Sequence, residues 1–318
     1  MAFRSGFVAI LGRPNAGKST LLNALAGEKL AIVSPKPQTT RNRILGILHI
    51  SRNASGAGAQ AILIDTPGIQ RPDSSLGRHM MAEVREAVSG CDLVLVLVDV
   101  ARKSEPLDRS LLNLLESSKA SAFLLLTKID LLGKQRHELL PLIEQYQRLY
   151  DFREIIPISA RTRDGLDLLI QELIANLPPG PRYFPQDQLT DQPLRFMAGE
   201  LIREQVLLQI REEVPHAATV VVEQFEEGAN LTRIAATLYC EREGQKRILV
   251  GREGQMLKSI GTSARREIER MLGRKVFLEL FVKVRSGWRD SRAFIEELDW
   301  RRQLEYLLPY PVDPTNVL

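Results

Sequence analysis

A glycine-rich loop closed by Lys-Ser lies near the start of the chain. It reads Gly12-Arg13-Pro14-Asn15-Ala16-Gly17-Lys18-Ser19, continues into Thr20, and stands between the apolar run 7–11 and the helical pattern 19–26. Glycine permits backbone geometry that a Cβ would obstruct, and the N–H groups of such a loop point at phosphate oxygens. Lys18 adds a point charge, and the Ser19 hydroxyl can ligate Mg²⁺. The order of strand, loop and helix therefore predicts a cradle for a nucleoside triphosphate, with an ordinary strand-to-helix turn as the alternative.

A second loop with the residue types of a phosphate site follows the apolar run 61–64. It reads Asp65-Thr66-Pro67-Gly68. The carboxylate of Asp65 can hold Mg²⁺ through water, and the N–H of Gly68 can meet a γ-phosphate. We therefore expect this loop to sense the terminal phosphate.

Two later loops carry groups suited to a guanine base. Thr127-Lys128-Ile129-Asp130 follows the run 122–126, and Ser159-Ala160 follows the run 155–158. The Asp130 carboxylate can accept both N–H donors of guanine, which adenine lacks, while the Lys128 stem packs against the base or the loop. A backbone N–H of the second loop could reach the guanine carbonyl oxygen. The predicted base is guanine, and an adenine nucleotide is the less favoured alternative.

The elements that must position these loops alternate along the first half of the chain. Strand candidates are the runs 7–11, 61–64, 93–98, 122–126 and 155–158, and helical patterns lie at 19–26, 76–88, 106–118, 135–149 and 164–176. Residues 43–50 read as a further strand that pairs antiparallel with 61–64 through the turn 51–59. Continuous apolar strands separated by helices predict an α/β fold with a mixed, mostly parallel sheet and the ligand at the carboxyl ends of its strands.

The rest of the chain divides into a linker, a second domain and a tail. The proline-rich stretch 177–181 ends the last helix, so we expect a first domain at 1–176 and a linker at 177–192. A second domain is predicted at 193–300 and a C-terminal tail at 301–318. The predicted elements of the second domain are a helix at 195–213, strands at 217–225, 232–241 and 246–250, a helix at 254–272, a strand at 275–284 and a helical segment from about residue 290.

The second domain contains the turn Gly251-Arg252-Glu253-Gly254, which we expect to join the strand 246–250 to the helix 254–272. KH domains clamp a nucleic-acid backbone with such a G-x-x-G turn. The turn, with Gln255 and Lys258, is therefore the candidate RNA contact. Residues 241–292 hold 14 cations and 7 anions, a net charge of +7 against +4 for the whole chain.

A solvated mixed-charge face is the alternative reading of that basic stretch. Few aromatic residues accompany the turn, so we expect base contacts from backbone groups and from apolar packing around Met256 and Ile260. Trp288 could stack on a base, although core packing is favoured.

The amino-acid composition limits the classes of protein to which the chain can belong. The 318 residues carry 44% hydrophobic residues, enough for two cores, and Cys91 and Cys240 fit no metal-ligand spacing. Reduced thiols are expected, which is typical of a cytosolic protein. The longest apolar runs, such as 93–98, are far below the roughly 20 residues of a membrane-spanning helix, so none is expected.

The four loops GRPNAGKS, DTPG, TKID and SA together resemble those of the P-loop GTPases, and the form GxPNxGKS is similar to their translation-factor-related, ribosome-assembly branch. Gln38-Thr39-Thr40-Arg41 resembles the first switch of that branch. The resemblance implies GTP or GDP as the ligand and Mg²⁺ as the cofactor. It makes Thr40 the second hydroxyl ligand of the metal beside Ser19 and Asp65, with Thr39, or a merely solvated loop, as the alternatives.

Two departures from the common GTPase pattern bear on catalysis. Residue 127 is Thr where most families have Asn, and Ile69 stands where Ras-like enzymes carry the Gln that orients the attacking water. Asn15 offers another route, because family members with Asn there can bind K⁺ against the phosphates; hydrogen bonding within the switch is the alternative. Lys18, Asn15, Thr40 and Gly68 are therefore the candidate catalytic residues, and hydrolysis is expected to be slow. We expect the two nucleotide states to order residues 34–43 and 66–80 differently.

Residues 5–300 as a whole resemble the Era family, a GTPase domain fused to a C-terminal type II KH domain. The shared stretches include Gln38-Thr39-Thr40-Arg41, Arg195-Phe196-Met197-Ala198 and Val282-Lys283-Val284-Arg285-Ser286-Gly287-Trp288-Arg289. The resemblance implies a monomer that binds the 3′ end of small-subunit ribosomal RNA, acts in assembly of the small ribosomal subunit and associates peripherally with the inner membrane. A nonenzymatic, GTP-regulated KH adaptor is the alternative.

Overall fold

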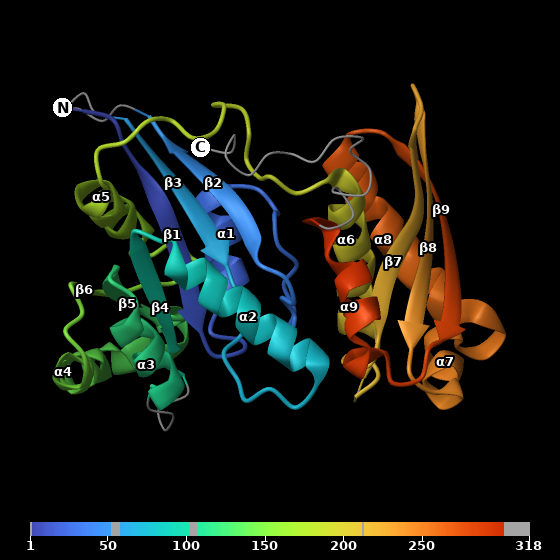
Figure 1. Ribbon diagram of the computed structural model, residues 1–318, viewed down its shortest axis with the longest axis horizontal. Coiled ribbons are helices and arrows are strands. Elements are labelled where there is room, and N and C mark those ends of the chain that lie inside the picture. Colours follow the sequence, from blue (N-terminus) through green and yellow to red (C-terminus); the bar gives the residue numbers. More distant parts are fainter. Residues whose placement is uncertain (1, 52–57, 102–106, 212, 302–318) are drawn as a thin grey trace. The chain divides into compact units, whose positions relative to one another are not determined.

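The computed structural model describes residues 2–51, 58–101, 107–211 and 213–301 (Figure 1). The predicted tail, apart from residue 301, and most of the predicted turn 51–59 lie outside the described residues. The chain forms two compact units. Of the described residues, the first unit comprises those within 2–31, 40–71 and 80–191, and the second comprises those within 32–39, 72–79 and 192–301.

A six-stranded sheet in the order β2-β3-β1-β4-β5-β6 is the centre of the first unit. Its strands are β1 (Arg4–Gly12), β2 (Ile44–Ile50), β3 (Ala59–Asp65), β4 (Leu93–Asp99), β5 (Ser121–Thr127) and β6 (Glu154–Pro157). β2 runs antiparallel to β3, with Ile44 opposite Asp65, and every other neighbouring pair is parallel. The predicted mixed, mostly parallel sheet is therefore confirmed, including its antiparallel edge strand.

Helices cover both faces of this sheet (Figure 1). They are α1 (Lys18–Ala26), α2 (Ser75–Ser89), α3 (Arg109–Ser117), α4 (Leu139–Leu149) and α5 (Leu166–Asn176), with a 3₁₀ segment at Ile129–Glu138. Successive strand residues point to opposite faces, so Val8 and Ile10 pack in the core beneath α1 and α5, whereas Ala9 and Leu11 pack in the core beneath α2 and α3. Burial on both faces leaves the strand ends as the place for polar groups.

The segment predicted as a linker is hydrogen-bonded to the first unit. The N–H of Ile47 donates to the carbonyl of Leu189 at 2.8 Å, and the Thr190 hydroxyl donates to the carbonyl of Leu45 at 2.6 Å. The side-chain oxygen of Gln60 accepts the N–H of Tyr183 at 2.8 Å. The contacts of Ile47 and Leu45 occupy the free edge of β2, which would otherwise offer unpaired backbone groups.

The second unit consists of a three-stranded sheet and packed helices. Its elements are α6 (Leu194–Gln209), β7 (Thr219–Glu227), β8 (Leu231–Cys240), α7 (Glu243–Val250), α8 (Gln255–Leu272), β9 (Lys275–Val284) and α9 (Arg292–Leu298). β7 and β8 are antiparallel, and β9 joins β8 in parallel as an edge strand. Apolar residues of α6 and α8 form one core with the sheet.

The prediction of a strand at 246–250 is wrong, because these residues form the last part of helix α7. The side-chain oxygen of Gln245 accepts the N–H groups of Glu241 at 2.9 Å and Arg242 at 3.1 Å, which satisfies backbone donors at the start of the helix. Leu249 is fully buried. Capping and packing thus outweigh the β-preferring run Ile248 to Val250, and the G-x-x-G turn joins two helices.

The structure also gives the environments of Trp288, Cys91 and Cys240. Trp288 is fully buried and donates its Nε1–H to the carbonyl of Ala217 at 2.8 Å, so it packs in the core and does not face a ligand. Cys91 and Cys240 are free thiols, and burial raises the pKa of Cys91 to about 11. In the described ranges, no helix combines the length and apolar character needed to cross a membrane.

Candidate functional site

The first phosphate loop lies between the end of β1 and the start of α1. Gly12 ends the strand, and Gly17 caps the helix with a φ of +97°. Lys18 folds back over the loop and donates from Nζ to the carbonyls of Gly12 at 3.2 Å and Arg13 at 3.0 Å. Burial lowers the pKa of Lys18 to about 8, with the nearby charge of Asp65 opposing the shift. Asn15 adopts a φ of +64° in this loop.

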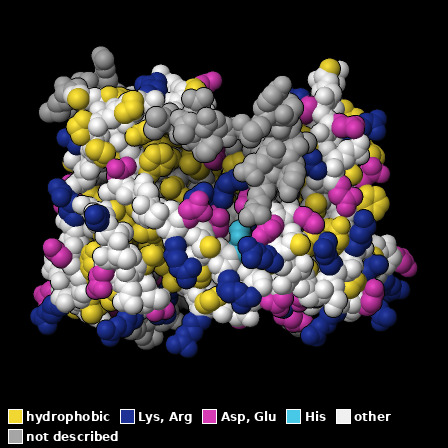
Figure 2. Space-filling model, in the orientation of Figure 1, with side chains coloured by type: hydrophobic (Ala, Val, Ile, Leu, Met, Phe, Trp, Pro, Cys, Tyr) yellow, Lys and Arg dark blue, Asp and Glu magenta, His cyan; other side chains and the backbone are white. Residues whose placement is uncertain are grey.

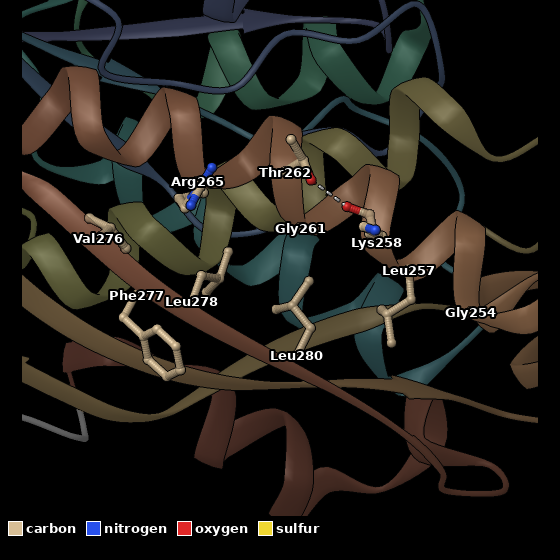
Figure 3. Close-up of a pocket in the computed structure, with 10 residues that line it drawn as sticks. All are labelled: Gly254, Leu257, Lys258, Gly261, Thr262, Arg265, Val276, Phe277, Leu278 and Leu280. Carbon is tan, nitrogen blue, oxygen red and sulfur yellow. Dashed lines mark hydrogen bonds between the residues drawn. The ribbon is translucent and has the colours of Figure 1, made fainter.

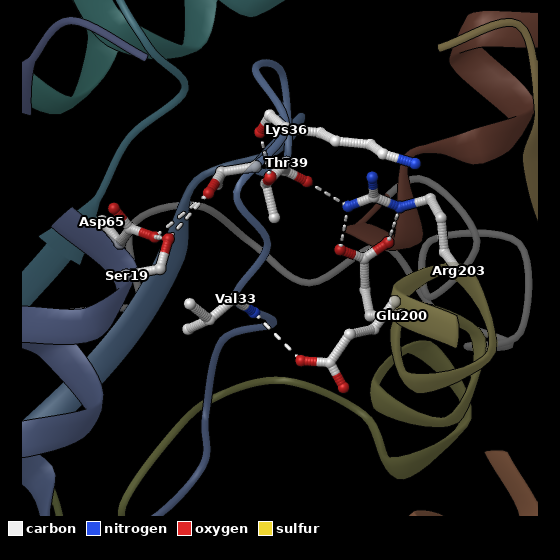
Figure 4. A network of polar contacts seen from close by, with 9 residues as sticks. Ser19, Val33, Lys36, Thr39, Asp65, Glu200 and Arg203 are labelled. Atoms are coloured by element: carbon white, nitrogen blue, oxygen red, sulfur yellow. Dashed lines mark hydrogen bonds and ion pairs between the residues drawn. The ribbon is translucent and has the colours of Figure 1, made fainter. Parts of the chain in front are cut away.

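A cluster of two hydroxyls and one carboxylate lies beside this loop. Ser19 Oγ donates to Asp65 Oδ2 at 2.6 Å (Figure 4). Thr40 Oγ1 lies 2.9 Å from Ser19 Oγ and 3.3 Å from Asp65 Oδ2. The hydroxyl of Thr39 instead donates to the carbonyl of Lys36 at 2.7 Å. The structure therefore brings Ser19, Thr40 and Asp65 together and places the Thr39 hydroxyl elsewhere.

The electrostatics of this cluster fit a divalent cation. Within the described residues, Asp65 Oδ1 is buried without a hydrogen-bond partner. Burial raises the pKa of Asp65 to about 6, although Lys18 and the two hydroxyls pull it down. A buried carboxylate oxygen that lacks a donor, next to two hydroxyl oxygens, is the oxygen-rich set that Mg²⁺ prefers.

The second phosphate loop packs directly on the first. A Cβ on Gly68 would lie 2.8 Å from the backbone of Pro14, so only glycine allows this approach. The N–H of Ile69 donates to the carbonyl of Gly12 at 3.1 Å, and the Thr66 hydroxyl donates to the carbonyl of Ile10 at 2.7 Å. The Ile69 side chain is 5% exposed and packs in the core, so it can orient no water.

The two base loops are tied to each other and to the first phosphate loop. The Thr127 hydroxyl donates to the carbonyl of Ala16 at 2.8 Å. Ser159 Oγ donates to Asp130 Oδ1 at 2.7 Å, which fixes the orientation of the carboxylate. Ala160 follows Ser159 and packs against the core.

Two features of the base loops were not foreseen from the sequence. Lys128, at a φ of +63°, places its Nζ 2.7 Å from Asp99 Oδ2. Asp99 ends β4, so its position at the carboxyl end of a parallel strand was the available signal. The second is the hydroxyl of Ser159, a residue for which the sequence predicts only a backbone contact. Both residues hold the base loops in place.

Three of the four residues of the G-x-x-G turn have positive φ angles. Gly251 has a φ of +73°, and a Cβ there would lie 2.6 Å from the Cβ of Met256. Glu253 and Gly254 also have positive φ angles, and Gly254 caps α8. Arg252 lies between Gly251 and Glu253 and is exposed, and Gln255 begins the helix.

A groove of about 580 Å³ runs beside this turn, between α8 and β9 (Figure 3). It is lined by Gly254, Leu257, Lys258, Gly261, Thr262, Arg265, Val276, Phe277, Leu278 and Leu280. Two of the predicted contacts, Gly254 and Lys258, are thus groove residues, whereas the rest of the predicted set forms the turn at its end. The β9 residues and Arg265 were not predicted, because only the edge position of β9 brings them to the groove.

The predicted base contact around Ile260 is wrong, because Ile260 is fully buried in the core. Met256 is partly buried against the same core. Phe277, 46% exposed, adds an aromatic residue to the groove that the sequence argument did not assign. Lys and Arg side chains are interspersed with Asp and Glu on the visible face of the second unit (Figure 2), so the net charge of this stretch does not form a uniform patch there.

The fold and the four loops define a P-loop GTPase domain followed by a KH domain. A family model described as 50S ribosome-binding GTPase matches residues 7–128, and a KH domain model matches residues 213–289. The chain is 46% identical to the GTPase Era of Ruminiclostridium cellulolyticum over 95% of this chain and 99% of the relative. It is 48% identical to the GTPase Era of Geobacter metallireducens over 94% and 98%. The chain belongs to the Era family and is a GTPase.

Two solved structures share this architecture across both units. An Era variant from Aquifex aeolicus bound to GDP·AlF₄⁻ aligns with a TM-score of 0.88 at 38% identity, over 93% of this chain and 99% of that one. Era in complex with MgGDPNP and nucleotides 1506–1542 of 16S ribosomal RNA aligns with a TM-score of 0.88 at 38% identity, over 94% and 99%. The likeness therefore extends over the nucleotide loops and the KH groove alike.

Proposed function

We propose that the protein is a slow GTP-hydrolysing switch that binds the 3′ end of small-subunit ribosomal RNA and acts in assembly of the small ribosomal subunit. The observation that carries this proposal is the 38% identical Era structure with MgGDPNP and 16S ribosomal RNA, which aligns over 94% of the chain. In this chain, a phosphate cradle and a G-x-x-G groove occupy the two corresponding units.

The residues beside the cradle would hold Mg²⁺. Ser19 and Thr40 would supply hydroxyl ligands and Asp65 a carboxylate through water, consistent with their distances of 2.6 to 3.3 Å. When bound, the metal neutralises charge on the phosphates. Lys18 would turn from its loop carbonyls toward the phosphates, and the N–H of Gly68 would contact the γ-phosphate.

The base loops support selection of guanine. Asp130, oriented by Ser159, would accept the two N–H donors of the base, and Lys128 would pack along it. The backbone of Ala160 would meet the guanine carbonyl oxygen. The Thr127 hydroxyl donates to the carbonyl of Ala16 and so connects the base loop to the phosphate loop. A GDP-loaded protein should therefore retain labelled GDP when challenged with excess ATP.

Hydrolysis without help should be slow, because a buried Ile69 replaces the water-orienting Gln. Unassisted GTPases of this kind turn over at about 10⁻⁴ to 10⁻³ s⁻¹. We further propose that Asn15 helps to hold K⁺ against the phosphates. Equal hydrolysis rates in Na⁺ and K⁺ buffers of the same ionic strength would exclude that role.

Single-turnover GTP hydrolysis with and without an oligonucleotide of the ribosomal RNA 3′ end tests the proposed switch. We expect measurable hydrolysis and binding of this RNA, with an unrelated RNA of the same length as the control. No hydrolysis under either condition would favour the nonenzymatic adaptor. Failure to bind the 3′-end RNA better than the control would contradict the assigned RNA target. Peripheral membrane association and a monomeric state stay predictions.

A further inference from the structure

Strand β9 of the second unit turns two aromatic rings toward solvent. Successive side chains of a strand point to opposite faces. The residues of β9 that pack against the core alternate with exposed ones. We call the exposed residues the β9 stripe; they are Lys275, Phe277, Glu279, Phe281 and Lys283. Phe277 is 46% exposed and Phe281 is 50% exposed, so both rings are accessible.

Such rings on an edge strand indicate a binding surface. β9 is the last strand of the sheet order β7-β8-β9, and an exposed apolar edge strand invites aggregation unless it serves a purpose. At a rise of about 3.3 Å per residue, Phe277 and Phe281 lie roughly 13 Å apart along the strand. That separation is too long for one base to stack on both rings. Each ring therefore offers a separate platform for a planar group.

The charges beside the two rings favour an anionic partner. Arg233 lies opposite Phe277 on β8, with its guanidinium carbon 5.7 Å from the centroid of the ring. Lys275 and Lys283 stand at the two ends of the stripe. These three cations accompany one stripe carboxylate, that of Glu279. A chain of phosphates would therefore be attracted along β9.

Strand β7, on the other side of β8, has the opposite charge. Glu226 lies opposite Arg233, and Glu223 Oε1 lies 3.6 Å from Lys283 Nζ. Glu227 is 3.4 Å from Arg274. Carboxylates on β7 repel phosphates, so a polyanion on this face would follow β9 and would not spread across the sheet.

The β9 stripe is continuous with the groove described above. Phe277 belongs to the stripe and also lines the groove between α8 and β9 (Figure 3). KH domains clamp about four nucleotides beside the G-x-x-G turn. A longer RNA strand that leaves the groove at Phe277 would reach the exposed face of β9 directly.

We propose that the β9 stripe is a second RNA subsite, on which bases of the single strand leaving the groove stack on Phe277 and Phe281. Every base has a face that can stack on an aromatic ring, so this subsite tolerates different sequences. Glu279, between the rings, only accepts hydrogen bonds and would receive N–H groups of a base. The inference rests on the proposed RNA binding and extends its site beyond the groove.

The test measures how RNA affinity depends on RNA length in the full chain loaded with GDPNP. The core probe is the tightest binder among overlapping fragments of about five nucleotides from the small-subunit 3′ end. Two extended probes add about the next four nucleotides on the 5′ or the 3′ side. Stacking on an aromatic ring increases affinity by about tenfold per base, so one extended probe should bind the wild type at least about tenfold more tightly than the core.

Phe281→Ala should lose most of the gain from the extension and bind the core probe within about twofold of the wild type. Phe281→Tyr keeps the ring and should restore the gain. Leu208→Ala is the control, because it removes a side chain of similar exposure, 51%, from helix α6, outside the sheet. That variant should bind both probes like the wild type. If Phe281→Ala does not fold, Phe281→Leu, which keeps apolar bulk without a ring, takes its place.

The outcomes separate this inference from the proposed function. If no fragment binds better than an unrelated RNA of the same length, the proposed RNA binding is wrong and the subsite with it. If the core binds but neither extension strengthens binding to the wild type, the groove stands and the subsite is refuted. A full gain from the extension in a folded variant without the Phe281 ring refutes it equally.

Discussion

At the scale of single residues, Thr127 connects the base loop to the phosphate loop. Its hydroxyl lies 2.8 Å from the carbonyl of Ala16 and 3.1 Å from that of Val98. An Asn at this position could also reach the purine, whereas a hydroxyl is too short to do both. The residue thus preserves the connection between loops and gives up a side-chain contact to the nucleotide.

Thr127→Val should show what the hydroxyl contributes. The isosteric change leaves the buried carbonyl of Ala16 without this donor, which costs about 1 to 3 kcal/mol in the free energy of unfolding. GDP affinity, measured by isothermal titration calorimetry, should fall because the loops are no longer joined. Thr127→Ser keeps the hydroxyl and should bind GDP like the wild type. Unchanged GDP affinity and stability in Thr127→Val would contradict this account.

At the scale of elements, the strands of the first unit could be predicted because their apolar runs are continuous and bounded by polar loops. The predicted run 122–126, for example, lies within β5, Ser121–Thr127. Helix α7 could not be predicted, because Ile248, Leu249 and Val250 favour a strand locally. Only the capping by Gln245 and the burial of Leu249 favour the helix. A local sequence pattern therefore predicts the type of element correctly where the tertiary packing favours the same type.

The same limit applies to the candidate sites. Residues adjacent in sequence, such as Asp65 to Gly68, could be assigned from the loop alone. For Asp99 the sequence offers one signal, its place at the carboxyl end of β4. Arg265 reaches the groove only because α8 packs against β9, which no local pattern predicts.

The turn between α7 and α8 offers a matched pair of glycine substitutions. Gly251→Ala places a Cβ 2.6 Å from that of Met256, whereas a Cβ on Gly254 has open space; both residues have positive φ. At Gly254, which lies in the αL region with φ +76° and ψ 7°, the change costs roughly 1 kcal/mol from the backbone. Gly251, with φ +73° and ψ 179°, lies in a region essentially restricted to glycine, so its backbone cost is higher, and the clash adds to it. We expect Gly251→Ala to lower the melting temperature more than Gly254→Ala. Equal melting temperatures would show that the turn relaxes around the new methyl group.

The groove beside α8 makes a prediction about salt dependence. Lys258 and Arg265 line it, so changing both to Gln should remove up to two phosphate contacts and reduce the slope of log affinity against log salt by about 1.4. Arg270→Gln is the control, since Arg270 is 74% exposed on the same helix, pairs with Glu267 and does not line the groove. RNA affinity measured across a salt series gives both slopes. An unchanged slope in the double variant would place the RNA elsewhere.

At the scale of the whole molecule, two stretches that overlap the segments predicted to respond to the nucleotide, residues 34–43 and 66–80, belong to the second unit. The two stretches are residues 32–39 and 72–79. The contact between Thr39 and Arg203 joins residues 164 positions apart, and the N–H of Ser75 donates to Asp290 at 3.0 Å. No sequence pattern predicts such pairs, because each depends on the packed fold.

The central claim is that nucleotide state controls RNA capture at the KH groove. Crosslinking an RNA of the small-subunit 3′ end to the full chain, loaded with GDPNP or with GDP, and mapping the sites by mass spectrometry tests it most directly. We predict crosslinks at residues 251–258 that are at least about fivefold stronger in one nucleotide state, the size of a modest coupling free energy. Equal crosslinking at these residues in both states would contradict the account.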